Sequence, residues 1–295
     1  RLYGAELGAW WMSGGAYAFA PIVDEAAGVV RFVAGGRDAR GRSRLGLVTV
    51  AWGDHPRVAG YSADPVLDLG ESGAFDMDGV SYPCVVDAGD ELRLYYAGWN
   101  KLGADVPFVT QLGLATSRDG GATFARASRA PLLPRTDAEP IGVGSSCVER
   151  DGHGWVMYYT RLLSWDVTQR PATPYYNLWK ARSHDGVAWE RLNVNVVTHA
   201  PGEYALGAPS RHDWDGRKQL YFTARGHRYR IFVAERAAGG AFVRAPQPLH
   251  VPASSWDDDM QCYPHVVAIG GQRYLLYCGN GYGRAGVGYA EWVAP

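Results

Sequence analysis

The chain has 295 residues, 47% of them hydrophobic, and a formal net charge of −1 at pH 7. This length allows a sizeable core, and the balanced charge gives no field that would attract nucleic acid or an anionic membrane surface. No apolar run approaches the roughly 18 residues of a membrane span, and the four cysteines show no CxxC spacing. We therefore expect a cytoplasmic protein without nucleic-acid partner, membrane partner or cofactor.

Five segments repeat one pattern along the chain: an anchor residue, a short apolar strand, a polar turn and a tyrosine-rich second strand. The anchors are Pro21, Pro83, Ser146, Pro209 and Pro264, which are spaced by 62, 63, 63 and 55 residues. A second hairpin signal follows each of the first four segments, as in GLATSRDGGATFARA after the second. Four strands per repeat predict an all-β fold, a five-bladed β-propeller with four-stranded antiparallel blades. A single blade cannot bury its own faces, so residues 1–295 are expected to form one domain.

Two turns in the outer halves of the repeats share a recognisable sequence. SRDGGATF (117–124) matches the "Asp box" of sialidase-type propellers, and SHDGVAW (183–189) is a looser version. Aspartate and glycine suit a tight turn, and the aromatic residue packs behind it. We expect both turns to be structural.

Acidic residues occur in the loops that lead into four of the five anchors. In a propeller these loops form one mouth of the central channel. They carry Asp76, Asp78, Glu139, Glu203, Asp257, Asp258 and Asp259. Converging carboxylates suit glycoside chemistry, in which one acid protonates the leaving oxygen and another activates water or attacks the sugar. The candidate catalytic residues are Asp78, Glu139, Glu203 and Asp259, with Glu203 as general acid and Asp78 as base or nucleophile. The alternative is that these loops are acidic because they are solvated.

A second set of side chains follows the anchors directly and shares one strand phase. It consists of Ile22, Cys84, Cys147, Ser210 and His265. Two cysteines and a histidine at equivalent positions could bind zinc, but cysteine is also a common small buried residue. We predict no metal site.

Aromatic and cationic side chains near the channel are candidates for substrate binding. They are Trp11, Tyr82, Trp99, Arg211, Tyr263 and His265. A guanidinium at Arg211 could clamp an anionic group of a ligand, or it could form a buried ion pair with a neighbouring blade. Arg161 and Arg225 could add to such a pocket. The segments 100–111 and 161–180 are interpreted as long loops that could act as lids.

The five repeats, with motifs such as DGVSYPCVV and GLATSRDGGATF, resemble the five-bladed glycoside hydrolases of families 32, 43, 68 and 130 over nearly the whole chain. The resemblance implies hydrolysis or transfer of glycosidic bonds by acids around a funnel. In families 32 and 43 these acids lie directly before the anchor, or two residues before it. Here the residues directly before the anchors are Ala20, Tyr82, Ser145, Ala208 and Tyr263, and those two before are Phe19, Ser81, Gly144, Gly207 and Cys262. None is acidic, so the family's catalytic residues cannot be carried over.

Two functions follow from these observations. The first is a carbohydrate-active enzyme of the glycoside hydrolase or transglycosidase type, which acts on a small-molecule or oligosaccharide ligand at the funnel. The second is a glycosidase-like propeller that has lost hydrolysis. It would bind a saccharide or catalyse another step on a polar metabolite in polysaccharide or natural-product biosynthesis. A protein-interaction propeller has no sequence signature here.

Overall fold

The computed structural model describes residues 1–293, and nearly all of their regular structure is β-strand. Two short 3-10 helices, η1 (Ala5–Leu7) and η2 (Trp10–Met12), precede the first strand. The predicted all-β class is therefore confirmed. Within the described residues, no helix has the length and apolar character needed to span a membrane.

The strands form successive antiparallel groups in chain order. The first group comprises β1 (Gly15–Asp24), β2 (Val29–Arg37), β3 (Ser43–Ala51) and β4 (Arg57–Tyr61). The second comprises β5 (Gly79–Asp87), β6 (Leu92–Lys101), β7 (Phe108–Ser117) and β8 (Ala125–Arg126). The third comprises β9 (Gly142–Arg150), β10 (Trp155–Asp166), β11 (Thr173–Ser183) and β12 (Glu190–Val197). The fourth comprises β13 (Ala205–Trp214), β14 (Arg217–Arg225), β15 (Tyr229–Arg236) and β16 (Phe242–Arg244). The fifth comprises β17 (Cys262–Ile269), β18 (Gln272–Cys278) and β19 (Val287–Glu291).

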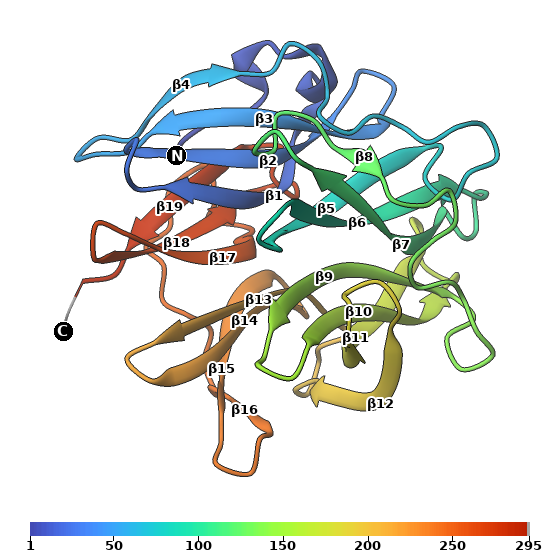
Figure 1. The fold of residues 1–295 in the computed structure, drawn as a ribbon. Helices are drawn as coiled ribbons and strands as arrows, with labels where there is room; N and C mark the ends of the chain where they lie inside the picture. The colour runs from blue at the N-terminus through green and yellow to red at the C-terminus, as the bar shows by residue number, and fades with distance from the viewer. Residues whose placement is uncertain (294–295) are drawn as a thin grey trace.

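The first strands of the groups contact one another in a cyclic order. β1 contacts β5, β5 contacts β9, β9 contacts β13, β13 contacts β17, and β17 contacts β1. Figure 1 shows these strands nearest the centre, with β4, β12 and β16 at the outside. Parallel pairs join β3 to β5 at Ser43 and Gly79, and β11 to β13 at Tyr176 and Ala205. The groups are thereby arranged around a common centre.

The N-terminal residues pair with the last strand. The Leu2 N–H donates to the Val287 carbonyl at 2.7 Å, and the Val287 N–H donates to the Tyr3 carbonyl at 2.8 Å. The first four groups have the four strands predicted, whereas the fifth has only three within residues 1–293. Residues near the start of the sequence extend this group at β19, which ties the first and fifth groups together.

The hydrophobic core lies between neighbouring groups rather than within any one of them. One buried cluster fills each interface. Each cluster contains side chains from neighbouring groups. Examples are Phe32 and Leu276 between the first and fifth groups, Leu45 and Leu94 between the first and second, and Leu112 and Met157 between the second and third. Leu178 and Phe222 lie between the third and fourth groups, and Tyr221 and Leu275 between the fourth and fifth. Each group has to bury both faces, and this explains the apolar residues in both phases of the strands.

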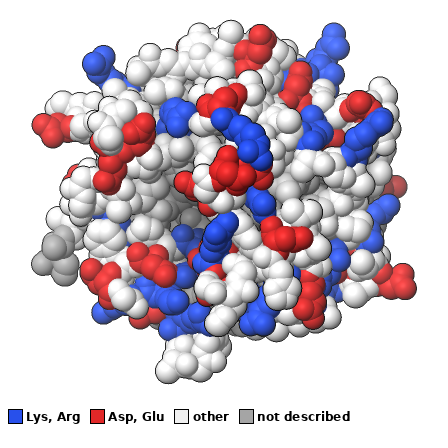
Figure 2. Space-filling model, in the orientation of Figure 1, with Lys and Arg blue, Asp and Glu red and all other residues white. Residues whose placement is uncertain are grey.

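The two Asp-box turns lie at the outside, between β7 and β8 and between β11 and β12. The Asp119 carboxylate accepts hydrogen bonds from the Ser117 hydroxyl at 2.6 Å and the Thr123 N–H at 3.0 Å. The Asp185 carboxylate accepts from the N–H groups of Val187 at 2.8 Å and Ala188 at 2.9 Å. The structural role expected for these turns is confirmed. Acidic and basic side chains are intermixed over the face shown in Figure 2, as the balanced charge implies.

The β2–β3 turn depends on the buried carboxylate of Asp38. Burial alone would raise the pKa of this group, but backbone N–H groups of Arg42 and Arg40 and the Arg44 guanidinium lower it from 3.8 to about 2. A carboxylate with a lowered folded-state pKa stabilises the protein above its unfolded pKa, and the stabilisation is lost as the pH falls through the folded value.

We predict that Asp38→Asn makes the free energy of unfolding less dependent on pH in the acid range. The free energy of unfolding of the unmodified protein should fall between about pH 4 and pH 2, and the variant should show a shallower fall in that window. Chemical denaturation at several pH values measures both slopes. Asp54→Asn, a change at an exposed turn, is the control. An unchanged slope in Asp38→Asn would contradict the prediction.

Candidate functional site

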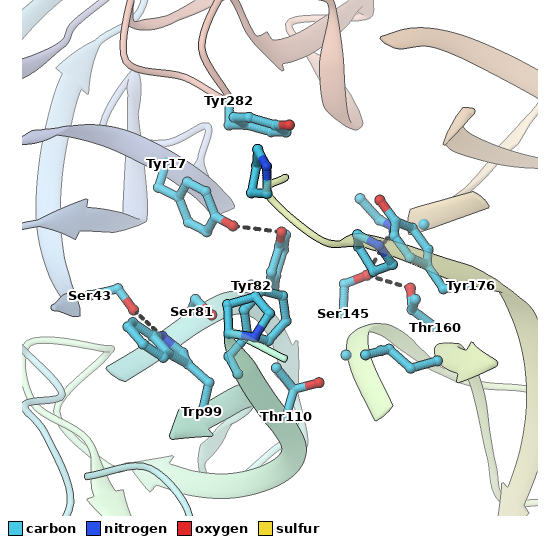
Figure 3. Close-up of a pocket in the computed structure, with 18 of the residues that line it drawn as sticks. Tyr17, Ser43, Ser81, Tyr82, Trp99, Thr110, Ser145, Thr160, Tyr176 and Tyr282 are labelled. Carbon is cyan, nitrogen blue, oxygen red and sulfur yellow. Dashed lines mark hydrogen bonds between the residues drawn. The ribbon is translucent and has the colours of Figure 1, made fainter. Parts of the chain in front are cut away.

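A cavity of about 870 Å³ lies where the first strands of the first four groups begin and the second strands end. Tyr17 of β1, Tyr82 of β5, Ser145 of β9 and Ala208 of β13 contribute to it, together with Tyr263 of β17. Figure 3 shows how side chains of the first and second strands surround the space. Its volume falls in the range of small-molecule sites.

A bulge in the first strand turns the residue before the anchor into this cavity. Tyr82, Ala208 and Tyr263 have φ values of 49°, 50° and 57°, which is the left-handed region that residues with a Cβ seldom adopt. The strand register shifts at the same places, for example between Ser81 and Cys84. Bulges of this kind redirect a side chain and are common next to active sites. Tyr82 and Tyr263 reach the cavity wall for this reason.

Tyrosines from several groups form two hydrogen-bonded sets on the wall. The hydroxyls of Tyr17 and Tyr82 are 2.6 Å apart, and those of Tyr82 and Tyr263 are 3.3 Å apart. The hydroxyls of Tyr176 and Tyr229 are 2.7 Å apart. Burial raises the pKa of Tyr82, Tyr176, Tyr229 and Tyr263 well above the usual value of 10. These four phenols are therefore neutral at pH 7 and exchange hydrogen bonds rather than carry charge.

A row of paired residues runs across the first two groups and faces the cavity. Arg37 is paired with Ser43, Ser43 with Gly79, Gly79 with Trp99, and Trp99 with Thr110. Residues paired directly across strands place their side chains on one face of the sheet. The Trp99 indole N–H donates to the Ser43 hydroxyl at 2.6 Å, which fixes the ring against the wall (Figure 3).

A matching row crosses the third and fourth groups. Leu162 is paired with Tyr176, Tyr176 with Ala205, Ala205 with Arg225, and Arg225 with Tyr229. All of these except Ala205 line the cavity. Each row thus brings one arginine to the wall, Arg37 in the first and Arg225 in the second.

Two projecting hairpins complete the wall. We predicted long loops at 100–111 and 161–180, but strand pairing continues through most of both, with Trp165 paired to Pro174 and Lys101 to Phe108. Only the tips are loops. Phe108 and Trp165 pack edge to face at 5.0 Å between ring centres, so the two hairpins contact each other.

Three of the six predicted substrate-binding residues line the cavity: Tyr82, Trp99 and Tyr263. Trp11 does not. Its side chain is fully buried in the core, and its indole N–H donates to the Ser62 carbonyl at 3.0 Å. The placement expected for Trp11 is wrong because its ring fills the space over Gly46, where a Cβ would collide with it.

Arg211 and His265 also lie away from the cavity. The Arg211 guanidinium forms ion pairs with Glu149 at 3.0 Å and Asp213 at 2.5 Å. Of the two roles considered for Arg211, the structure therefore shows the ion pair with a neighbouring group and not the ligand clamp. His265 packs on Phe19, and burial lowers the pKa of its imidazole to about 4. It borders a separate void of about 20 Å³ that shares Tyr82 and Tyr263 with the cavity.

None of the four predicted catalytic acids lines the cavity, and no other carboxylate of residues 1–293 does so. Asp78 accepts the Lys101 backbone N–H at 2.8 Å. Glu139 is fully buried beside Tyr159 and Arg191. Glu203 forms two hydrogen bonds of 2.6 Å with Arg244, and the Asp259 side chain is 70% exposed. The expectation that these acids converge at one mouth is therefore corrected.

The physical reason is a repeated buried contact, which we call the carboxylate anchor. An acid six or seven residues before the repeat anchor binds a tyrosine of the second strand, an arginine of the fourth strand, or both. Asp76 accepts from the Tyr96 hydroxyl at 2.9 Å and Arg126 Nε at 2.8 Å, and Glu139 accepts from Tyr159 at 2.6 Å and Arg191 Nε at 2.7 Å. Asp257 accepts from the Tyr277 hydroxyl at 2.9 Å, and Glu203 is held by Arg244.

The repeat contained a signal for Arg37 and Leu162, which we did not predict, as well as for Trp99 and Arg225, which we named. Arg37, Trp99, Leu162 and Arg225 each lie sixteen positions after their anchors, and all four line the cavity. An alignment of the repeats at this position would have identified Arg37 together with Trp99. Tyr17, Ser43 and Thr110 show no comparable signal, because only the strand pairing brings them together.

Residues 1–293 contain no group of three or more side chains suited to hold a metal ion. The cysteines considered for zinc accept backbone hydrogen bonds between groups instead. Cys84 Sγ accepts from the Val148 N–H at 3.3 Å, and Cys147 Sγ accepts from the Arg211 N–H at 3.3 Å.

Comparisons with known proteins identify two kinds of match. Relatives that are similar in sequence are described as uncharacterized, and solved structures of low sequence identity share the fold. Two uncharacterized proteins of Mycobacterium tuberculosis, MT1551 of strain CDC 1551 / Oshkosh and Rv1502 of strain ATCC 25618 / H37Rv, are 35% identical over 267 residues. The match covers 89% of this protein and 87% of each relative. No protein-family model matches.

Solved structures with the same fold are glycoside hydrolases and related proteins. One described as a glycoside hydrolase has a TM-score of 0.74 and 17% identity, covering 94% of this protein and 87% of that one. A member of the GH130 family has a TM-score of 0.71 and 17% identity, covering 96% and 85%. A thermostable family-43 glycoside hydrolase has a TM-score of 0.69 and 12% identity, covering 95% and 90%. The predicted likeness to the glycoside hydrolase-like propellers is confirmed at the level of the fold.

The carboxylate anchors generate a test of their structural role. We predict that Glu139→Gln lowers the free energy of unfolding by about 3 kcal/mol, because Arg191 loses its buried partner. Glu190→Gln, at an exposed position next to Arg191, should change it by less than about 0.5 kcal/mol. Denaturant unfolding of the three proteins measures the difference. Equal stability of the two variants would contradict a structural role for Glu139.

Proposed function

The chain belongs to the family of the Mycobacterium tuberculosis proteins MT1551 and Rv1502, and we propose that it binds a saccharide in the described cavity without hydrolysing it through paired carboxylates. We also infer that residues 1–295 form one domain, a five-bladed propeller. The cyclic contacts of the first strands and the pairing of Tyr3 with Val287 support this reading.

One observation carries the proposal: the cavity wall is rich in aromatic rings and hydroxyls, and no carboxylate from the described residues belongs to it. Flat rings such as those of Trp99 and Trp165 can stack on the C–H faces of a sugar, while hydroxyls bind its oxygens. Hydrolysis by the usual mechanisms needs two carboxyl groups within about 5 to 9.5 Å of each other on either side of the bond. This wall supplies the binding groups without that pair.

Two polar atoms near the cavity also favour a ligand. Thr110 Oγ1 and Trp165 Nε1 are buried, and neither has a hydrogen-bond partner within residues 1–293. Buried polar atoms without a partner are costly, so ordered water or a bound molecule satisfies them. Both residues line the cavity, and hydroxyl groups of a saccharide have the donors and acceptors that they require.

The bulge positions suggest how a hydrolase fold could retain binding without hydrolysis. In the families that the sequence resembles, acids precede the anchors, whereas this protein has Tyr82 and Tyr263 directly before two of them. Both phenols are neutral at pH 7, and burial raises the pKa of each hydroxyl further above its usual value of 10. A neutral phenol donates or accepts a hydrogen bond, but it cannot act as the carboxylate nucleophile or base.

We predict that Trp99→Ala weakens saccharide binding about 30-fold, as expected when a central aromatic residue of a binding site is truncated. The ligand is the tightest binder in a panel of oligosaccharides, ranked by the rise in melting temperature that it causes. Calorimetric titration measures the affinity. Trp10→Ala, at an exposed tryptophan away from the cavity, should bind as the unmodified protein does. Unchanged binding by Trp99→Ala would place the saccharide elsewhere.

We further predict no turnover of aryl glycosides by the unmodified protein under conditions in which saccharide binding is saturated. Release of the coloured phenol provides the measurement. Turnover that disappears in Asp78→Asn and Glu203→Gln would overturn the proposal, and hydrolysis by the acids predicted from the sequence would then be the correct function.

A further inference from the structure

Resting on the proposed saccharide site, we infer that its ligand is an anionic saccharide, whose carboxylate or phosphate group is held by Arg37 and Arg225. The inference goes beyond saccharide binding because it assigns the charge of the ligand. It follows from the charge of the cavity wall and from the surroundings of these two side chains.

The formal charge of the wall is entirely positive. Arg37, Lys101 and Arg225 line the cavity, and no aspartate or glutamate of residues 1–293 does. This contrasts with the whole sequence, in which acidic and basic residues nearly balance. A concave site with charges of one sign raises the local concentration of ligands of the opposite sign.

The two arginines differ from the arginines of the carboxylate anchors and of the β2–β3 turn because they lack carboxylate partners. Arg44, Arg126, Arg191 and Arg244 each form an ion pair of 2.8 Å or less, whereas Arg37 and Arg225 form no ion pair with any of the described residues. Drawing a charged group away from water is costly unless an opposite charge or hydrogen bonds compensate it. Arg37 is exposed and Arg225 is partly buried, so solvent reaches both side chains. A ligand that closes the cavity over them would displace that water, and its anionic group would compensate the guanidinium charges.

Aromatic rings hold these guanidinium groups in place without neutralising them. The Arg37 guanidinium lies 4.7 Å from the centre of the Tyr17 ring, and that of Arg225 lies 4.9 Å from Tyr229 and 5.3 Å from Tyr204. Burial raises the pKa of the Tyr229 hydroxyl well above its usual value, so this partner is neutral. Ring stacking leaves the N–H groups of an arginine at its edge available for a carboxylate or phosphate.

Each arginine also stands beside groups suited to a sugar. Arg37 is paired directly with Ser43, and Ser43 orients Trp99 in the same row. In the second row, Ala205 separates Arg225 from Tyr176, and Arg225 is paired directly with Tyr229. A sugar ring on Trp99 or Tyr176 would therefore have its substituents near a guanidinium. Free inorganic anions would use the arginines without the rings.

The experiment compares matched ligands by calorimetric titration at two salt concentrations. A trisaccharide of galacturonic acid is paired with the neutral galactose trisaccharide, and glucose 6-phosphate is paired with glucose. Inorganic phosphate is the anion without a sugar. We expect at least one anionic member to bind at least ten-fold more tightly than its neutral partner and than inorganic phosphate, with a preference that weakens at high salt. The two pairs distinguish the carboxylate from the phosphate.

Variants test the residues. Arg37→Gln and Arg225→Gln should each weaken binding of the preferred anionic saccharide about ten-fold and reduce its preference over the neutral partner. Arg217→Gln removes an exposed arginine from the opposite end of β14 and should bind as the unmodified protein does. Arg37→Lys, which keeps the charge but not the planar fork, should retain part of the preference. Melting temperatures identify any variant that is unfolded.

The outcomes separate this inference from the proposed function. Equal affinity for neutral and anionic saccharides would overturn the inference and leave the saccharide site intact. Inorganic phosphate binding as tightly as the sugar phosphate would overturn the role of the sugar. If no saccharide of either charge binds, the proposed function and the inference both fall.

Discussion

Buried or partly buried carboxylates join the loop ahead of four first strands to the second or fourth strand of the same group. Asp76 and Glu139 each bind a tyrosine of the second strand and an arginine of the fourth, and Asp257 and Glu203 make related contacts. None of these four carboxylates lines the cavity. The same contacts that fix the leading loops therefore remove acids from the cavity that the loops surround.

The bulges before the anchors decide which side chains take the place of acids there. A left-handed residue in a strand places its side chain where regular alternation would not, and this strain is tolerated because the surrounding strands hold it. Tyr82 and Tyr263 occupy such positions, and their hydroxyls meet at 3.3 Å although 181 residues separate them. Neutral phenols at this point favour recognition of a polar ligand over proton transfer.

The two cross-strand rows explain why the cavity has both aromatic and cationic character. Arg37 and Trp99 belong to one row, and Tyr176 and Arg225 to the other. Pairing in register places their side chains on one face, so both rings and guanidinium groups face the space. Solved glycoside hydrolases share the fold at 12% to 17% identity, which leaves the wall free to differ. Function in this fold depends on the wall rather than on the strands.

The sequence by itself determined the all-β class, the repeat and the Asp-box turns, because strand period and turn chemistry are local. It also indicated Tyr82, Trp99 and Tyr263, which occupy repeat positions that face the centre. Only the tertiary structure determined whether the acidic side chains line the cavity. Glu139 and Glu203 precede their anchors much as a catalytic residue would, yet their arginine partners lie 41 to 52 residues further along the sequence. Packing between groups likewise determines the positions of Trp11, Arg211 and His265 outside the cavity. Whether a polar side chain reaches the cavity or a buried partner depends on contacts between distant strands, and these contacts exist only once the groups have assembled.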